Sequence, residues 1–98
     1  KHRLIALVKP QFELQERNRE LPPEEEIPFD GVVRDAATVK QLLRETLLRL
    51  WAGDGARPEA IIESPIRGNR GNREFLVDLR GTEETPNLEW IDELLAGL

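Results

Sequence analysis

Near its start the chain reads Leu4-Ile5-Ala6-Leu7-Val8-Lys9-Pro10-Gln11-Phe12-Glu13. Five consecutive apolar residues predict a strand that is buried on both faces. Lys9 and Pro10 end this strand abruptly, and burying a lysine there costs free energy unless a neighbouring group interacts with its ammonium. Because ligands bind at the carboxyl ends of strands in open α/β sheets, Lys9 is the first candidate for a functional residue.

A second stretch contains a cluster of arginines and reads Ser64-Pro65-Ile66-Arg67-Gly68-Asn69-Arg70-Gly71-Asn72-Arg73-Glu74-Phe75-Leu76-Val77. Between Pro65 and Arg73 it holds three arginines and no acidic residue. We give equal weight to two interpretations of Arg67, Arg70 and Arg73: they bind RNA phosphates, or they belong to a solvated turn. Because the whole chain has a formal net charge of -5, it is not predicted to bind nucleic acids in general.

The composition is typical of one globular domain with a modest core. The chain has 98 residues, of which 39% are hydrophobic and 34% are charged. It has no cysteine and one histidine, His2, so neither a disulfide framework nor a metal site is predicted. Because the sequence shows no apolar run of about 18 residues and no secretory leader, we expect a cytoplasmic protein without a membrane partner.

The segment after the first strand predicts a long connection followed by a helix. Residues 14–31 are rich in Glu, Arg and Pro, so we expect a mobile loop that ends in a turn at Asp30-Gly31. Asp35 is the expected N-cap of a helix over residues 36–52. Apolar residues at three- and four-residue spacing form one stripe along this helix. They are Val39, Leu42, Leu43, Leu47, Leu50 and Trp51.

Two further strands are predicted, over residues 59–64 and 74–80, and the short turn between them makes them an antiparallel pair. The first strand, the helix and the second strand form a right-handed crossover. The predicted fold class is α/β: a three-stranded mixed sheet in the order first-third-second, with the third strand antiparallel to both neighbours. Asn87 is the expected N-cap of a C-terminal helix, and Trp51 and Trp90 are the expected core anchors.

The outer edge of the first strand needs a neighbour, because an unpaired apolar edge favours association. The rest of a larger domain, or a second copy of the chain, would supply that neighbour. The chain begins with Lys1 and enters a strand within three residues, so we expect it to be a fragment of a longer protein.

Four segments together carry a family resemblance. They are Val8-Lys9-Pro10-Gln11-Phe12-Glu13, Gly31-Val32-Val33-Arg34-Asp35, Ser64-Pro65-Ile66-Arg67-Gly68 and Gly71-Asn72-Arg73-Glu74-Phe75-Leu76. In this order they resemble the C-terminal half of the TlyA (hemolysin A) family, which belongs to the FtsJ-type S-adenosylmethionine-dependent methyltransferases. The resemblance spans roughly residues 4–80. It implies a partial Rossmann-like methyltransferase sheet whose last strand runs antiparallel, between its neighbours.

The resemblance implies an activity and two catalytic residues. The family is associated with methylation of ribose 2′-hydroxyls in ribosomal RNA, with S-adenosylmethionine as the cofactor and a Lys-Asp-Lys-Glu catalytic tetrad. By their positions in the motifs, Lys9 resembles the second lysine of the tetrad and Glu74 resembles its glutamate. Lys9 would act in the network at the acceptor hydroxyl, and Glu74 would orient a lysine.

The chain also departs from the family pattern. It lacks the glycine-rich cofactor loop, the first lysine and the aspartate of the tetrad. We therefore interpret residues 1–80 as the C-terminal portion of an FtsJ-like methyltransferase domain and residues 81–98 as a helical extension. The chain is not expected to bind S-adenosylmethionine tightly by itself, and it is expected to need ribosomal RNA and the missing N-terminal half, or a second copy, as partners.

Each functional assignment has a simpler alternative. Lys9 could be a strand-end lysine that extends into water, and Glu74 could be a solvent-facing residue at the start of a strand. Gln11, Phe12 and Glu13 should line the same cleft as Lys9, where Phe12 either stacks on a base or packs against the protein. Asp35 fits a helix cap better than a catalytic acid.

The alternative function is a non-catalytic interaction module. The absence of a cofactor loop favours a remnant that pairs through its exposed first strand, as a homodimer. Membrane lysis, which the hemolysin name suggests, has no support in the sequence, because there is neither a transmembrane segment nor a basic amphipathic helix.

Overall fold

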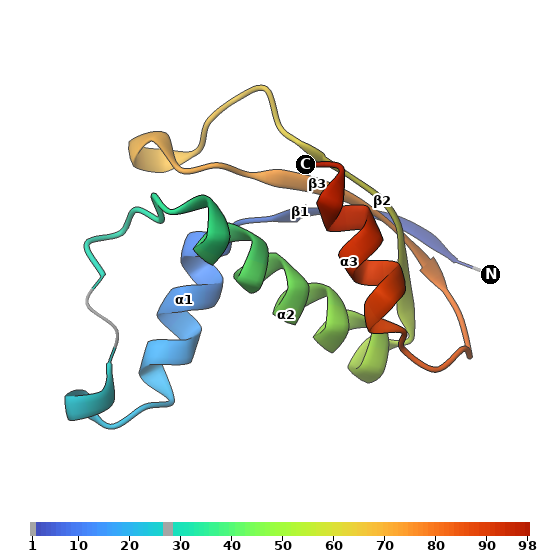
Figure 1. Cartoon of the computed structure of the whole chain (residues 1–98), viewed down its shortest axis with the longest axis horizontal. Helices are drawn as coiled ribbons and strands as arrows, with labels where there is room; N and C mark the ends of the chain where they lie inside the picture. Colours follow the sequence, from blue (N-terminus) through green and yellow to red (C-terminus); the bar gives the residue numbers. More distant parts are fainter. Residues whose placement is uncertain (1, 27–28) are drawn as a thin grey trace.

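The computed structural model describes residues 2–26 and 29–98, which form a three-stranded sheet and three α-helices. Two short 3-10 turns, Pro23–Glu25 and Asn69–Gly71, lie in the connections. The main elements follow in chain order (Figure 1): β1 Arg3–Val8, α1 Pro10–Arg19, α2 Ala36–Asp54, β2 Ala56–Glu63, β3 Phe75–Gly81 and α3 Leu88–Ala96.

The sheet has the strand order β1-β3-β2, and β3 is antiparallel to both neighbours. This order, with its α/β class, was predicted from the sequence and is confirmed. In the register, Phe75 is the partner of Val8 on one side and of Glu63 on the other. The last residue of β1, the first of β3 and the last of β2 therefore lie side by side at one end of the sheet.

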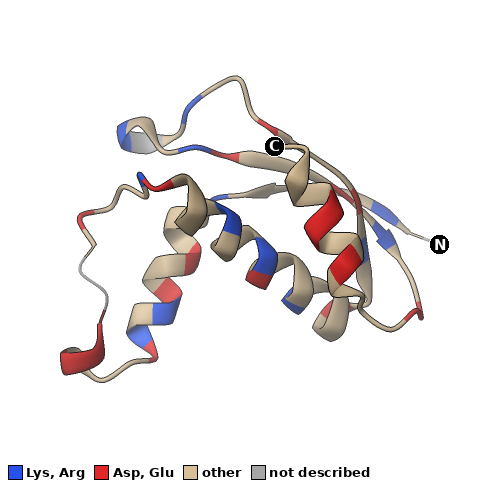
Figure 2. Ribbon diagram, viewed as in Figure 1, with Lys and Arg blue, Asp and Glu red and all other residues tan. Residues whose placement is uncertain are grey.

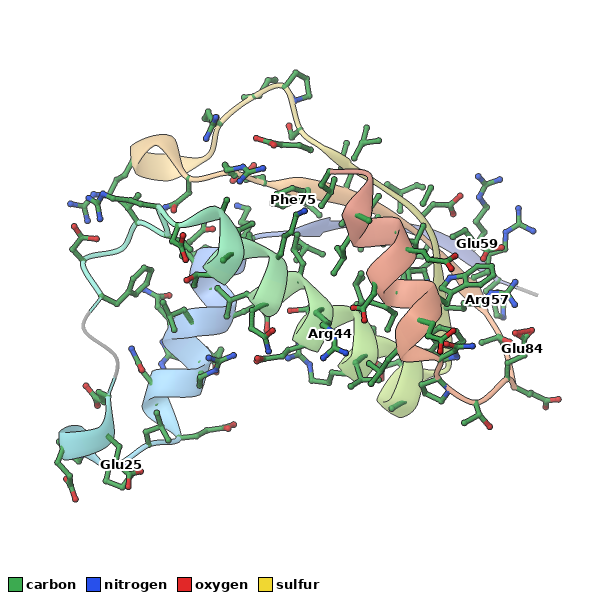
Figure 3. The ribbon with its side chains drawn as sticks, in the orientation of Figure 1. Glu25, Arg44, Arg57, Glu59, Phe75 and Glu84 are labelled. Atoms are coloured by element: carbon green, nitrogen blue, oxygen red, sulfur yellow. The ribbon has the colours of Figure 1, made fainter. Side chains whose placement is uncertain are left out.

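The helices cover one face of the sheet (Figure 1). Along β3 the buried side chains alternate with less buried ones, so that Phe75, Val77 and Leu79 contribute to the core. Figure 3 shows Phe75 between the sheet and α2. Leu43 and Leu47, from the predicted apolar stripe of α2, are fully buried against this face.

The ends of α2 follow local sequence signals. The Asp35 carboxylate accepts a hydrogen bond from the backbone N–H of Thr38 at 3.1 Å, which confirms the predicted N-cap. The helix continues two residues beyond the predicted end and is closed by Gly55, whose φ of 64° is left-handed. Glycine adopts this conformation without the steric cost that a Cβ brings.

The prediction of a mobile loop over residues 14–31 is wrong for its first third, because α1 occupies Pro10–Arg19. Pro10 lies in the first turn, where its fixed φ suits a helix and no N–H is needed. Leu14 is buried, and ion pairs from Glu13 to Arg49 and from Arg17 to Glu45 connect the helix to α2. The helix therefore depends on tertiary contacts rather than on an apolar stripe of its own.

The second strand begins earlier than predicted, at Ala56 instead of residue 59. Pro58 thus lies inside the strand, although proline has no N–H to donate to a neighbouring strand. β2 is an outer strand, however, and the register shifts between Pro58 and Ala60, so the missing N–H is tolerated.

The C-terminal helix α3 belongs to the same core. The Asn87 side chain accepts a hydrogen bond from the backbone N–H of Trp90 at 3.2 Å, which confirms the predicted cap. Ile91 and Leu95 of α3 are buried. The prediction of two tryptophan core anchors holds for Trp51, whereas Trp90 is 39% exposed and meets Trp51 edge to face at 6.5 Å between ring centroids.

Ion pairs also fasten α3 and the segment before it. Arg57 contacts Glu59 at 2.9 Å and Glu84 at 2.6 Å, and Figure 3 shows these three side chains together near one end of the sheet. Arg44 of α2 contacts Asp92 of α3 at 2.7 Å. Residues 81–98 are thus held to the sheet and to α2 by charge as well as by apolar packing.

Candidate active site

Lys9 and Glu74 meet at the end of the sheet where β1 finishes and β3 begins. Lys9 directly follows Val8, and Glu74 directly precedes Phe75, the partner of Val8 in the register. The Lys9 Nζ atom lies 3.7 Å from Glu74 Oε2. The side chains are 33% and 13% exposed, respectively, so the pair is partly shielded from water. The antiparallel register thus brings together two predicted site residues that are far apart in the sequence.

Lys9 has a second interaction that the sequence did not indicate. Its Nζ atom lies 5.2 Å from the centroid of the Phe12 ring, within the range of a cation–π contact. The ammonium is therefore held between a carboxylate and an aromatic face, at the N-cap position of α1. An ammonium fixed in this way can donate a hydrogen bond to a hydroxyl oxygen of a ligand.

The loop between β2 and β3 is closed around Glu74 by backbone hydrogen bonds. The N–H of Ser64 donates to the carbonyl of Glu74 at 2.8 Å, and the N–H of Gly68 donates to the carbonyl of Asn72 at 2.8 Å. The N–H of Gly71 donates to the carbonyl of Gly68 at 3.1 Å. These bonds fix the main chain on both sides of the Glu74 carboxylate.

Asn72 connects this loop to the segment that precedes α2. Its side chain is buried, donates from Nδ2 to the carbonyl of Gly31 at 2.7 Å and accepts from the N–H of Val33 at 3.0 Å. Gly31 has a positive φ of 96° in the predicted Asp30-Gly31 turn. Two of the four segments that carry the family resemblance therefore contact each other directly.

The three arginines of the loop differ in their surroundings. Arg73 contacts Glu63 at 2.8 Å, and Arg67 approaches the same carboxylate at 3.9 Å. The hydrogen bond from Arg73 is the main reason why the pKa of Glu63 lies below its usual range; burial acts in the opposite direction. Arg73 is 27% exposed and its charge is already balanced, so it is less available to a phosphate than Arg67.

Arg70 is exposed and has a left-handed backbone, with φ of 60°. Its Nη1 donates to the backbone carbonyl of Asp30 at 2.6 Å. Figure 2 shows basic and acidic positions close together around this loop instead of one basic surface. The structure brings the three predicted RNA-binding arginines into one loop but leaves only Arg67 and Arg70 facing solvent.

The residues after Lys9 separate in the structure. Phe12 is 52% exposed, and Glu13 pairs with Arg49 at 3.0 Å. Both line a hollow of about 380 Å³ beside β1, together with Leu7, Lys9, Thr46 and Leu50. Gln11 is instead 5% exposed, and its Oε1 has no hydrogen-bond partner within the described part of the chain.

Two residues of this hollow, Thr46 and Arg49, were not predicted. They lie on α2, and helical spacing alone does not show which polar residue of α2 reaches the end of β1.

Within residues 2–26 and 29–98, no group of three or more His, Cys, Asp or Glu side chains is placed to hold a metal ion. None of the described helices has both the length and the apolar character needed to cross a membrane.

Solved structures that share this fold include two that are described as hemolysins. One is described as a "putative hemolysin" from Streptococcus thermophilus; it has a TM-score of 0.66 and 32% sequence identity over 97% of this chain. The other is a "putative hemolysin" from Lactococcus lactis, with a TM-score of 0.61 and 30% identity over 97% of this chain. This chain covers only 32% and 42% of their respective lengths. No family model and no curated protein matches the sequence.

Proposed function

We propose that this chain is the C-terminal part of an S-adenosylmethionine-dependent methyltransferase that acts on ribose 2′-hydroxyls of ribosomal RNA. The observation that carries the proposal is the Lys9–Glu74 pair, 3.7 Å apart at the ends of neighbouring strands. The resemblance to the TlyA (hemolysin A) family assigns these residues to the second lysine and the glutamate of the catalytic tetrad. Likeness to two solved structures, each described as a "putative hemolysin", is consistent with the hemolysin name of that family.

The proposed role of the pair concerns the acceptor hydroxyl. A ribose hydroxyl is a poor nucleophile until its proton is removed or engaged in a strong hydrogen bond. Lys9 would hold the hydroxyl oxygen, and Glu74 would fix the direction of the Lys9 side chain. Arg67 and Arg70, the two exposed arginines of the neighbouring loop, would bind phosphates of the same RNA.

The cofactor would supply the methyl group, but the residues of this chain do not form a site that fits it. The sequence has no counterpart of the glycine-rich cofactor loop that follows the first strand of the family's complete domain. We therefore place S-adenosylmethionine, the first lysine and the aspartate of the tetrad on the remainder of a longer protein.

The test is methyl transfer to ribosomal RNA by the complete protein that contains this chain. We expect Lys9→Ala and Glu74→Gln each to lower the rate by about 100-fold or more, the usual range for an acid–base group. Lys40→Ala, on the exposed side of α2, is the control and should leave the rate unchanged. Full activity of both site variants, with unchanged circular dichroism, would rule out the proposed role of the pair.

A second candidate is a non-catalytic module that self-associates through β1. It is favoured by the position of β1 at the edge of the sheet and by the exposure of Leu4, Ile5 and Leu7, at 61%, 58% and 50%. An exposed apolar edge strand can pair with a strand of another chain. A homodimer formed in this way would not need the cofactor or the Lys9–Glu74 pair.

A further inference from the structure

We infer that Gly68 is a positioning residue, because the space left by its missing side chain holds the Glu74 carboxylate beside Lys9. The inference rests on the proposed function only for its effect on methyl transfer; the geometry itself does not depend on that function. An added Cβ at Gly68 would lie 2.6 Å from Cδ and 3.1 Å from Cγ of Glu74, and would meet Oε2 more closely still. A methyl group and the carboxylate cannot both occupy this volume.

Hydrogen bonds hold the main chain around Gly68 and Glu74, whereas the Glu74 side chain is flexible. Gly68 donates to Asn72 and accepts from Gly71, while the carbonyl of Glu74 accepts from Ser64. Moving either backbone segment would break at least one of these bonds. The side chain of Glu74 is therefore the part that yields.

Displacing this side chain would break the ion pair with Lys9. The Glu74 side chain is only 13% exposed, so its carboxylate would leave an enclosed place for one closer to solvent. The described glycines with positive φ are Gly31, Gly55 and Gly71, and Gly68 is not one of them. Alanine therefore suits the backbone at position 68, and the substitution tests the contact with Glu74 rather than backbone strain.

Competitive acylation of lysines measures the state of the pair directly. A lysine whose ammonium is held by a carboxylate is acylated more slowly than an unpaired lysine. Lys40 on α2 is exposed and serves as the internal reference. Limiting amounts of an N-hydroxysuccinimide ester are applied to the complete protein that contains this chain. Peptide mass spectrometry then gives the labelling ratio of Lys9 to Lys40.

We expect Gly68→Ala to raise this ratio severalfold, to the level of Glu74→Gln. In the double variant the two changes should not add, because both remove the same ion pair. Gly53→Ala is the matched control, since a Cβ there meets nothing within 4 Å, and should give the wild-type ratio. A wild-type ratio for Gly68→Ala, when Glu74→Gln raises it, would overturn the inference. A wild-type ratio for both variants would overturn it as well, because there would be no pair to position.

Methyl transfer by the same variants separates this inference from the proposed function. If labelling of Lys9 rises in Gly68→Ala and activity falls as in Glu74→Gln, both are supported. If labelling rises while activity stays at the wild-type level in both variants, Gly68 still positions Glu74, but the pair is not catalytic. A thermal unfolding curve for each variant distinguishes these outcomes from a general loss of structure.

Discussion

Three carboxylates illustrate how single residues stabilise the loops around the site. Hydrogen bonds from Arg34 lower the pKa of Asp30 to about 2, and hydrogen bonds from Thr38 lower the pKa of Asp35. The hydrogen bond from Arg73 does the same for Glu63. A carboxylate whose pKa is lower in the folded chain stabilises the fold above its unfolded pKa, and this contribution is lost as the pH falls through the folded pKa.

The stability that the Asp35 cap contributes should depend on pH. We expect Asp35→Ala to lower the urea midpoint of unfolding at pH 7, because the N-cap of α2 is lost. The difference from wild type should shrink as the pH falls below the ordinary range for Asp, since protonation weakens the cap in the wild-type chain. Asp35→Asn is the control because asparagine caps without titrating. A wild-type-to-alanine difference that is constant with pH would contradict the prediction.

Among the elements, α1 differs from the rest in how it is held. Its apolar contribution to the core is Leu14, and its other links to α2 are the Glu13–Arg49 and Arg17–Glu45 ion pairs. Such partly exposed ion pairs contribute little stability individually. The helix that follows Lys9 is therefore expected to open more readily than α2, which is buried along one face.

We predict that Leu14→Ala raises amide hydrogen exchange in α1 by about tenfold or more, while α2 changes much less. The reason is that a buried Leu→Ala change costs about 2–5 kcal/mol, and most of this cost falls on the element with few other contacts. Gln15→Ala, at an exposed position of the same helix, is the control. Equal increases in α1 and α2 would show that the two helices open together.

The sequence predicts some helices, strands and contacts of this fold and not others. The first strand was recoverable from its run of apolar residues, and α2 from the three- and four-residue spacing of its apolar stripe, while Asp35 and Asn87 marked two helix starts. The prediction that the first strand is buried on both faces is wrong, because Leu4, Ile5 and Leu7 are exposed at the edge of the sheet. The meeting of Lys9 with Glu74 follows from the antiparallel order alone. The helix α1 could not be predicted, because its buried residues Pro10, Gln11 and Leu14 do not form an apolar stripe. The Arg73–Glu63 pair depends on side-chain positions that spacing does not encode.

In the described part of the chain, the helices cover one face of the sheet and leave the other uncovered. The helices pack against the face that contains Phe75 and Val77, while Ile5 of β1 and Ile62 of β2 remain 58% exposed on strands at the two edges. A hollow of about 310 Å³ on the uncovered face is lined by these two residues and by Ala60, Leu76 and Asp78 among others. Exposed apolar side chains that lie together on a sheet face can contribute to an interface, although Asp78 and its ion pair with Arg3 also lie on this face.

The second candidate function predicts self-association through the edge of β1. Sedimentation velocity from about 10 μM to 1 mM should show a dimer that is lost when Leu4 and Ile5 are both replaced by Lys, because charge at an edge strand opposes pairing. Ile66→Lys is the control, since Ile66 is 75% exposed in the loop between β2 and β3. A monomer at every concentration would exclude the module that pairs through β1.

The central place of β3 has a consequence for biosynthesis. β1 and β2 do not pair with each other; each pairs with β3, which comes last of the three described strands in the sequence. On the ribosome, the pairing of either strand with β3 must therefore wait until residues 75–81 have left the exit tunnel. Sheet formation is thus a late event in translation, and a pause before β3 would prolong the interval in which the nascent chain can aggregate.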